Sequence, residues 1–129
     1  MTHIVIVDDE ADTHLLYKLK LKKLFAPIGD LNLVSFLKAQ DCLDYLHNTN
    51  SPPVDLILSD INMPEMDGFE LLQEIQKLKH PVPVYVVSAY ESSEYKNKAR
   101  HLGAVRFLSK PVDFNQLGEA LKTDLNLSF

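Results

Sequence analysis

The chain has 129 residues, of which 46% are hydrophobic and 24% charged, the ordinary balance of a globular protein with one core. A formal net charge of −5 argues against general affinity for nucleic acid or an anionic membrane. No apolar run approaches the roughly 20 residues that cross a bilayer, and no secretion signal opens the chain. The single cysteine, Cys42, excludes an internal disulfide and fits a reducing compartment. We therefore expect one cytoplasmic domain over residues 1–129, without membrane or direct nucleic-acid contact.

Five short segments predict β-strands. Residues 4–7, 54–58, 82–87 and 105–108 are nearly continuous in apolar side chains, and a looser segment, 31–37, comes second in chain order. Continuous rather than alternating apolar runs are typical of parallel strands that are covered on both faces. The segments therefore predict the strands of a buried parallel sheet.

The segments between these strands have apolar residues at helical spacing. The first helix is expected from about Glu10 to Phe25, although Leu and Lys alternate along part of it. Apolar residues at helical spacing in three others are Ala39, Cys42, Leu43 and Leu46; Leu71, Leu72, Ile75 and Leu78; and Phe114, Leu117, Leu121 and Leu125. Asp67 and Asp113, each followed three residues later by Glu or Gln, predict N-caps. The segment 91–102 has the fewest apolar anchors and predicts the most weakly held helix.

The alternating order of strands and helices predicts an α/β protein, a three-layer sandwich with a five-stranded parallel sheet and five helices. Helical crossovers between parallel strands are expected to be right-handed. In such sheets a functional crevice lies at the C-terminal ends of the strands, near a switch point in the topology.

Polar residues stand where that crevice is expected. Asp8 and Asp9 follow the first strand, Asp60 the third, Ser88 the fourth and Lys110 the fifth. Three carboxylates brought together would repel one another, and a hard divalent cation such as Mg²⁺ removes that conflict. A lysine ammonium and a serine hydroxyl are suitable partners for phosphoryl oxygens. The set predicts an aspartate nucleophile in a site for phosphoryl transfer.

Four motifs resemble those of the receiver domain of two-component response regulators. They are Val7-Asp8-Asp9-Glu10, Ser59 to Gly68, Val87-Ser88-Ala89 and Lys110-Pro111, in the order of that family and across essentially the whole chain. The resemblance implies a flavodoxin-like strand order 2-1-3-4-5. It also implies that Asp60 takes a phosphoryl group from a phosphohistidine on a sensor histidine kinase or histidine phosphotransfer protein. The Lys110-Pro111 bond is expected to be cis, which proline makes far less costly.

The same resemblance assigns the remaining roles around the acceptor. The residues expected to hold Mg²⁺ or Mn²⁺ are Asp8, Asp9, Asp60 and the backbone carbonyl of Asn62. Lys110 and Ser88 would hold phosphoryl oxygens.

The resemblance also implies a switch. Ser88 and Phe107 would move on phosphorylation and change the face of the fourth helix, fifth strand and fifth helix, which binds a downstream protein. Ser88 and Phe107 replace the commoner Thr and Tyr, as family variants. Asn62 and Tyr90 would flank the path of the attacking water, so that bulky Tyr90 slows hydrolysis of the phosphoaspartate.

Other interpretations are set beside this one. A calcium loop is disfavoured because Pro64 and Glu65 occupy ligand and glycine positions, and a haloacid-dehalogenase site would place Asp where Asn62 stands. Two rivals remain: a receiver fold used only for protein binding, and an enzyme with turnover on a separate substrate, which we do not expect. The chain is either a stand-alone receiver or part of a longer protein. Leu15, Leu19 and Leu21 could form a docking or homodimer surface.

Overall fold

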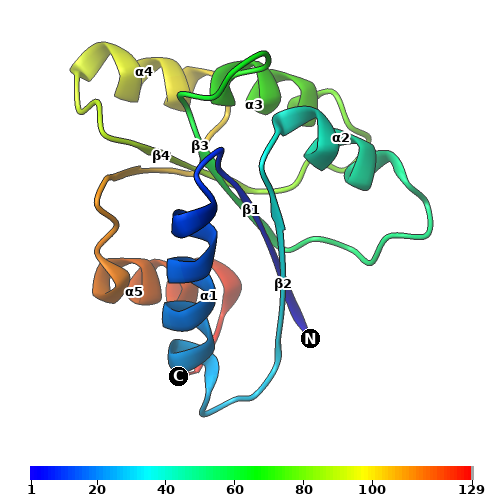
Figure 1. Ribbon diagram of the computed structural model, residues 1–129, viewed down its shortest axis with the longest axis vertical. Helices are drawn as coiled ribbons and strands as arrows, with labels where there is room; N and C mark the ends of the chain where they lie inside the picture. Colours follow the sequence, from blue (N-terminus) through cyan, green and yellow to red (C-terminus); the bar gives the residue numbers. More distant parts are fainter. Residues whose placement is uncertain (129) are drawn as a thin grey trace.

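The computed structural model describes residues 1–128 and has the predicted alternation of strands and helices. The strands are β1 (Thr2–Val7), β2 (Leu31–Phe36), β3 (Leu56–Asp60), β4 (Val84–Ser88) and β5 (Arg106–Ser109). The helices are α1 (Ala11–Phe25), α2 (Ala39–His47), α3 (Gly68–Gln76), α4 (Ser93–His101) and α5 (Phe114–Leu125). Helices α1 and α5 cover one face of the sheet and α2, α3 and α4 the other (Figure 1). The predicted three-layer α/β sandwich is confirmed.

The sheet has the order β2-β1-β3-β4-β5, and each pair of neighbouring strands is parallel. The chain passes from β1 outward to β2 and then returns across β1 to β3, so the direction of winding reverses beside β1. This is the expected flavodoxin-like order, and ligand sites lie at such reversals, beyond the carboxyl ends of the strands.

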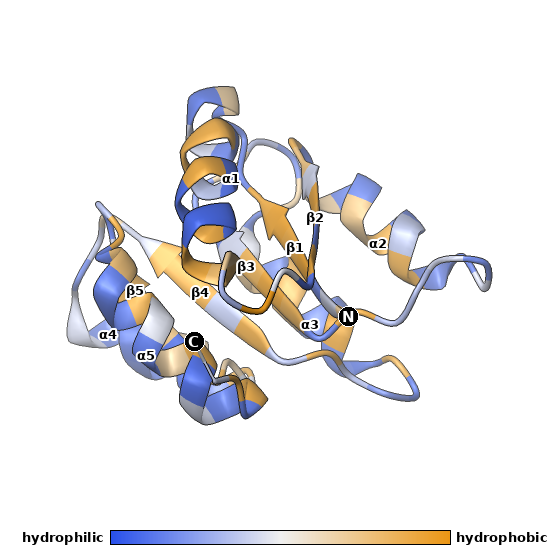
Figure 2. Cartoon of the chain, turned by 90° about the horizontal axis from the view of Figure 1, so that it is seen from below, coloured by the Kyte–Doolittle hydropathy of each residue, from blue (hydrophilic) through white to orange (hydrophobic). Residues whose placement is uncertain are grey.

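Two hydrophobic clusters hold the layers together. Ile4 and Ile6 of β1 pack with α1 and α5, whereas Val5 and Val7 pack with the helices of the other face. Successive side chains of a strand point to opposite faces, so a strand covered on both sides needs apolar residues at every position. Figure 2 shows β1, β3 and β4 as largely hydrophobic strands at the centre of the molecule.

Both predicted N-caps are present. The Asp67 carboxylate accepts a hydrogen bond from the Glu70 amide at 2.9 Å, and the Glu70 side chain accepts one from the Asp67 amide at 3.3 Å. Asp113 accepts hydrogen bonds from the amides of Asn115 and Gln116. These caps satisfy amides that have no partner within the first turn of a helix. They fix where α3 and α5 begin, after the loops that follow the C-terminal ends of β3 and β5.

The first helix corrects one expectation. Leu15 and Leu19 are exposed as predicted, but Leu21 is fully buried and belongs to the core. Tyr17, Leu21 and Phe25 are spaced four residues apart, so they form one stripe on the helix, and that stripe faces the sheet. Leu21 therefore cannot contribute to a docking or dimer surface.

The expectation of a weakly held fourth helix is confirmed. Helix α4 has a single buried residue, Ala99, and is the least anchored of the five described helices. Cys42 lies in the core, where burial raises the pKa of its thiol to about 12. Within residues 1–128, no helix combines the length and the apolar character needed to cross a membrane.

Candidate functional site

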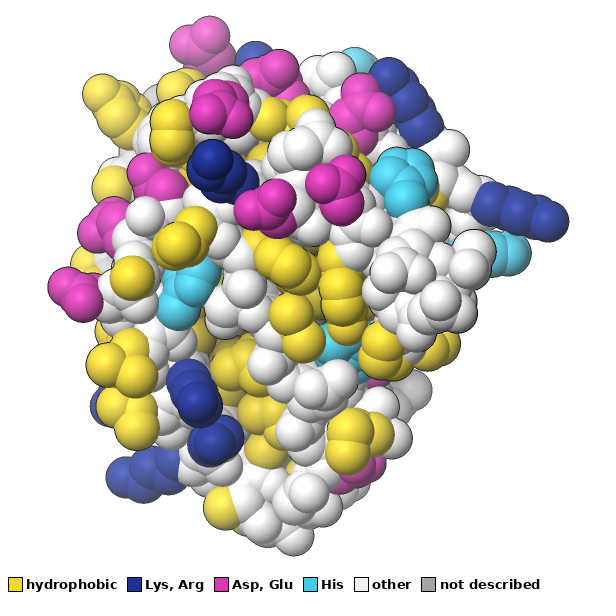
Figure 3. All heavy atoms as spheres, turned by 45° about the vertical axis from the view of Figure 1, so that its right-hand side comes forward, with side chains coloured by type: hydrophobic (Ala, Val, Ile, Leu, Met, Phe, Trp, Pro, Cys, Tyr) yellow, Lys and Arg dark blue, Asp and Glu magenta, His cyan; other side chains and the backbone are white. Residues whose placement is uncertain are grey.

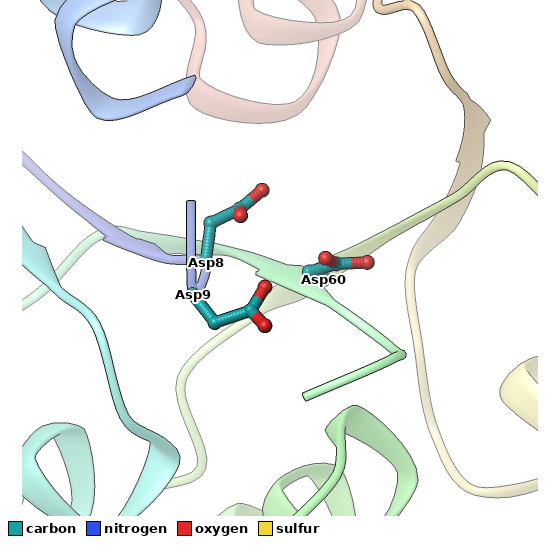
Figure 4. Close-up of side chains that lie close together, drawn as sticks. All are labelled: Asp8, Asp9 and Asp60. Atoms are coloured by element: carbon teal, nitrogen blue, oxygen red, sulfur yellow. The ribbon is translucent and has the colours of Figure 1, made fainter. Parts of the chain in front are cut away.

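The predicted site residues meet at the C-terminal ends of the strands. Asp8 and Asp9 follow β1, and Asp60 is the last residue of β3. One carboxylate oxygen from each of these three aspartates lies within 4.8 Å of the others. Figure 4 shows the three carboxyl groups turned toward the same space. Asp8 and Asp60 are buried, while Asp9 is exposed at the mouth of the site.

The strand register brings the other side of the site into place. Ser88 pairs with Ser109 in the β4–β5 ladder, and the Lys110 amide donates a hydrogen bond to the Ser88 carbonyl at 2.9 Å. Lys110 therefore leaves the sheet beside Asp60, although 50 residues separate the two along the chain. The Lys110-Pro111 bond is cis, as predicted.

A glycine allows α3 to begin close against the end of β3, just after Asp60. The Gly68 amide donates to the Ile61 carbonyl at 2.8 Å. A Cβ atom at Gly68 would lie 2.2 Å from the Asp60 carbonyl oxygen, a backbone atom that cannot move aside. Only glycine fits at this close approach. The Gly68 that closes the second motif thus positions the loop after Asp60.

Lys110 is the cation that faces the carboxylates. Its ammonium lies 3.0 Å from Asp60 Oδ2, 3.2 Å from Asp8 Oδ2 and 3.9 Å from Glu10 Oε1. Burial lowers the pKa of Lys110, but the hydrogen bond to Asp60 and the charges of Asp60 and Asp8 outweigh it, so the pKa is raised. Lys110 therefore remains charged and pairs with two carboxylates at once.

For Asp60, the effect of burial on the pKa outweighs that of the opposite charge. Burial raises the pKa of Asp60 and the charge of Asp8 raises it further, while the contact with Lys110 lowers it without cancelling the effect. The net pKa of Asp60 is raised. Burial, followed by the negative charges of Asp8 and Asp60, also raises the pKa of the nearby Tyr17 hydroxyl. The site therefore holds more negative charge than Lys110 neutralises.

Two contacts in the β1–α1 loop were not assigned from sequence. Asp8 Oδ1 accepts a hydrogen bond from the Glu10 amide at 2.9 Å, which fixes the direction of the carboxylate. His14 Nε2 lies 2.6 Å from the Asp8 carbonyl oxygen, to which it donates. His14 lies on the first helix, six residues after Asp8, and no sequence pattern identifies the Asp8 carbonyl as its partner.

The remaining predicted residues lie around this centre. The Ser88 side chain is buried, and its Oγ accepts a hydrogen bond from the Tyr90 amide at 3.0 Å. The Tyr90 ring is 60% exposed and lies 5.4 Å from the Tyr95 ring, between centroids. Asn62 is exposed in the loop that follows Asp60. None of these three contacts the aspartate cluster directly through a hydrogen bond in the described part of the chain.

Phe107 lies apart from the carboxylates, in the middle of β5. It pairs with Val86 of β4 and packs, half-buried, against the core beneath α4. The ammonium of Lys96 lies 5.9 Å from the centre of its ring. Phe107 thus links β5 to α4 and stands three residues before Lys110.

The donor set at the site fits a hard divalent cation. All three clustered side chains offer carboxylate oxygens, the ligands that Mg²⁺ and Mn²⁺ favour over nitrogen or sulfur. The buried pair Asp8 and Asp60 carries charge that a cation would neutralise. In Figure 3, most acidic side chains of the visible face lie in its upper part. Such a field attracts cations to the site.

Comparison with known proteins agrees with this geometry. The family model of the response regulator receiver domain matches residues 4–122. The transcriptional regulatory protein GlrR of Escherichia coli is 33% identical over 126 residues, 98% of this chain and 27% of GlrR. The response regulator protein PilR of Pseudomonas aeruginosa is 33% identical over 123 residues, 95% of this chain and 26% of PilR. The chain spans about a quarter of the length of these relatives.

Solved structures show the same architecture. A response regulator receiver protein from Pseudomonas putida superposes with a TM-score of 0.82 at 28% identity, covering 95% of this chain and 96% of that one. The signal receiver domain of an HD domain-containing protein from Pseudomonas fluorescens gives 0.77 at 28% identity, covering 97% and 94%. Because the family match covers residues 4–122, most of the chain and the whole acidic site, the chain belongs to the response regulator receiver domain family, the signalling domain of two-component systems.

Proposed function

We propose that Asp60 is the phosphoryl acceptor of a two-component or phosphorelay pathway. The observation that carries this proposal is the contact of the buried Asp60 carboxylate with both Lys110, at 3.0 Å, and the acidic pair that follows β1. In the reaction, a carboxylate oxygen of Asp60 attacks phosphorus while the bond from phosphorus to the donor's histidine nitrogen breaks. The electron pair of that bond stays on the histidine nitrogen. The product is an acyl phosphate on Asp60.

The acidic residues are proposed to hold Mg²⁺ or Mn²⁺. Asp8, Asp9, Asp60 and the backbone carbonyl of Asn62 would supply its protein ligands. A bound divalent cation neutralises charge on the carboxylates and on the incoming phosphoryl oxygens. Asp8 is prepared for this role because the Glu10 amide fixes one of its carboxylate oxygens. The raised pKa of Asp60 also favours a cation, since a nearby positive charge stabilises the ionised nucleophile.

Lys110 and Ser88 are proposed to hold two phosphoryl oxygens. The Lys110 ammonium already lies within hydrogen-bond distance of Asp60 Oδ2. The Ser88 hydroxyl uses a lone pair to accept from the Tyr90 amide, and its proton remains able to donate to a phosphoryl oxygen. Positioned donors of this kind stabilise charge that develops during phosphoryl transfer.

Movement of Ser88 is proposed to carry the signal outward. Ser88 ends β4 and is joined through the Tyr90 amide to the loop before α4. As Ser88 turns toward the phosphoryl group, Phe107 would move beneath α4, which has only Ala99 buried. Segments with few buried contacts open at the lowest free-energy cost. The α4–β5–α5 face would then bind a downstream protein differently.

Tyr90 and Asn62 are proposed to set the lifetime of the phosphorylated form. Both side chains are exposed, Asn62 in the loop after Asp60 and Tyr90 two residues after Ser88, and the Tyr90 ring contacts the Tyr95 ring. Tyr90→Ala should hasten dephosphorylation, as measured by loss of the phosphorylated mass with time. An unchanged rate in that variant would remove Tyr90 from this role.

The proposed donor is a sensor histidine kinase or a histidine phosphotransfer protein, which meets the site at the C-terminal ends of the strands. Leu15, Leu16 and Leu19 are exposed on α1 beside this end and offer an apolar surface to such a partner or to a second copy of the chain. The proposed unit spans residues 1–129, promotes its own phosphorylation and dephosphorylation, and acts in the cytoplasm, where Cys42 stays reduced.

The test is to incubate the chain with Mg²⁺ and acetyl phosphate and to weigh it beside Asp60→Asn. The expected result is a mass gain of one phosphoryl group that the substitution and metal chelation both abolish. If neither acetyl phosphate nor a partner kinase produces a gain, the chain acts as a protein-binding module instead. A gain that persists in Asp60→Asn would place the acceptor elsewhere.

A further inference from the structure

A hollow of about 530 Å³ lies at the end of the sheet opposite the aspartate site. The loop that leads from α2 into β3 forms one wall, and the loop that leads from α3 into β4 forms the other. These loops lie where the parallel strands begin, whereas Asp8, Asp60 and Lys110 stand where strands end. The volume falls within the range of about 300–1,000 Å³ that is usual for small-molecule sites. The hollow is therefore separate from the acceptor site and large enough for a ligand of its own.

Most of the lining of this hollow is apolar. Tyr45 and Leu46 come from α2, Val54 from the loop before β3, and Leu78 and Val82 from the loop between α3 and β4. All five are half-buried and pack against the core cluster beneath α2, α3 and α4. A concave apolar surface of this kind favours an aromatic or aliphatic ligand over a sugar or another strongly polar one.

Hydrogen bonds from outside the hollow hold one of its walls. His3 Nε2 lies 2.8 Å from the Tyr45 hydroxyl oxygen, and His3 Nδ1 lies 3.1 Å from the Asn32 carbonyl oxygen, so this ring joins α2 to β1 and β2. The His3 amide donates to the Asp55 carboxylate, and the Asp55 amide donates to the His3 carbonyl, both at 2.8 Å. These two bonds fix the loop directly after Val54. Because the wall is pre-formed, a ligand that binds there loses little free energy to ordering the protein.

Positive charge stands at the rim. Lys79 and His80 line the hollow and are exposed. Neither has an ion pair within residues 1–128, whereas the neighbouring Lys77 is paired with Glu74 at 3.0 Å. The described lining contains no acidic side chain. A carboxylate at the rim would therefore meet an unneutralised ammonium and an imidazole that can donate a hydrogen bond.

Other occupants fit the hollow less well. The C-terminal ends of α2 and α3 lie beside it and carry partial negative charge, so a doubly charged phosphate would be repelled more than a single carboxylate. A cationic ligand would face Lys79. A single side chain of a protein partner would leave much of the 530 Å³ unfilled. An aromatic ring, in contrast, can pack against the Tyr45 ring and the aliphatic side chains together.

We propose that this hollow binds a small aromatic monocarboxylate, with its ring against Tyr45 and its carboxylate at Lys79 and His80. The site goes beyond the proposed function and does not rest on it, because it needs neither a metal nor a phosphoryl group on Asp60. Failure of one proposal leaves the other standing.

The chain supplies a matched control for the test. Lys77 precedes Lys79 by two residues, but it is paired with Glu74 and does not line the hollow. Lys79→Gln and Lys77→Gln remove the same charge from the same loop, and only the first removes it from the rim. Both side chains are exposed, so each variant should fold, which circular dichroism and thermal unfolding establish.

The probe is naphthalene-2-carboxylate, titrated into the full chain labelled with ¹⁵N. Naphthalene-2-carboxamide serves as a neutral analogue of the same shape and 2-naphthylmethylamine as a cation. We expect saturable changes in amide chemical shift within residues 45–54 and 78–82, with a dissociation constant of about 1 mM or below, as is usual for a ligand of this size. The carboxamide should bind about threefold more weakly. Lys79→Gln should weaken the carboxylate by about the same factor, and Lys77→Gln should leave its affinity nearly unchanged.

Three results would overturn the proposal. Shifts that do not saturate, or that centre on residues 8–9, 60 and 110, would mean that the hollow is not a binding site for this ligand. Equal or tighter binding of the carboxamide or the amine would remove the carboxylate from the recognition. Equal losses in Lys79→Gln and Lys77→Gln would mean that only long-range attraction acts on the probe.

Discussion

Two clusters in this molecule pair carboxylates with a cation but differ in charge balance. At the ends of β1 and β3, the carboxylates of Asp8, Asp9 and Asp60 face a single ammonium, that of Lys110. Between β5 and α5, Arg106 meets Asp124 one to one through two hydrogen bonds of 2.7 and 3.1 Å. The first cluster carries surplus negative charge, and the second is neutral.

The pKa values record this difference. The Arg106 hydrogen bond lowers the pKa of Asp124, with a further contribution from the Tyr85 hydroxyl, which donates to the same carboxylate. At Asp60, burial dominates and the pKa is raised despite Lys110. A neutral, mutually hydrogen-bonded set stabilises the fold by itself. A buried set with surplus charge lowers the stability of the fold, and a bound ligand of opposite charge would neutralise that surplus.

The largest effect is expected when Lys110, the one cation that faces the acidic cluster within residues 1–128, is removed. Lys110→Ala should slow phosphorylation by acetyl phosphate at least about 100-fold, the usual cost of losing one donor to a developing anion. Lys122→Ala is the control, because Lys122 pairs with Glu119 on the exposed side of α5. The measurement is the rate of mass gain. A variant that is phosphorylated about as fast as the unmodified chain would contradict the role of Lys110.

Adding a cation should stabilise one cluster and leave the other unaffected. Mg²⁺ at about 100 times its dissociation constant should raise the free energy of unfolding by about 2.7 kcal/mol. The gain should largely vanish in Asp9→Asn and persist in Asp124→Asn. Thermal unfolding across a Mg²⁺ titration measures it, with Ca²⁺-free buffer and a chelator as baseline. Equal gains in both variants would place the metal outside the aspartate cluster.

Breaking the neutral pair should destabilise the chain. Asp124→Asn leaves Arg106 without its carboxylate and should lower the free energy of unfolding by about 1–2 kcal/mol. This range is modest because both groups are partly exposed to solvent. The folded pKa of Asp124 is lowered, so its stabilising effect is present above the unfolded pKa near 3.8 and is lost as the pH falls through the folded value. Urea unfolding at pH 7 and below pH 4 should show the difference between the chains shrinking. A constant difference would contradict an ionic cause.

The acidic cluster could be predicted because its members stand at strand ends. Parallel strands finish at one edge of the sheet, so Asp8, Asp60 and Lys110 had to converge once the strands were placed. The strand order itself came from the resemblance, since spacing along the chain does not determine which strands are neighbours. Tyr17, Leu21 and Phe25 are spaced four residues apart, and this helical spacing predicts a buried stripe that includes Leu21.

The neutral cluster could not be predicted in the same way. Tyr85 and Asp124 are 39 residues apart, and Arg106 and Asp124 are 18 apart. Their meeting depends on how α5 lies across β4 and β5, which no local pattern encodes. In the sequence, Asp124 resembles any acidic residue near the end of a helix. The hydrogen bond from His14 to the Asp8 carbonyl escaped prediction for the same reason, because it depends on the angle at which α1 leaves the loop.

The smallest expected effect distinguishes the two clusters most clearly. An Asp→Asn substitution should raise the free energy of unfolding in the acidic cluster and lower it in the neutral one. With metal chelated, Asp60→Asn should stabilise the chain at pH 7 by up to about 1 kcal/mol, since it removes a buried charge that Lys110 neutralises only in part. A raised folded pKa means that the ionised carboxylate costs stability. That cost shrinks as the pH falls below the folded pKa and is gone below the unfolded pKa near 3.8, so the two chains should converge in acid. Urea unfolding from pH 7 downward in the presence of a chelator measures it. If Asp60→Asn destabilises the chain as Asp124→Asn does, then the contact with Lys110 outweighs the cost of burying the Asp60 charge, and the contrast between the two clusters fails.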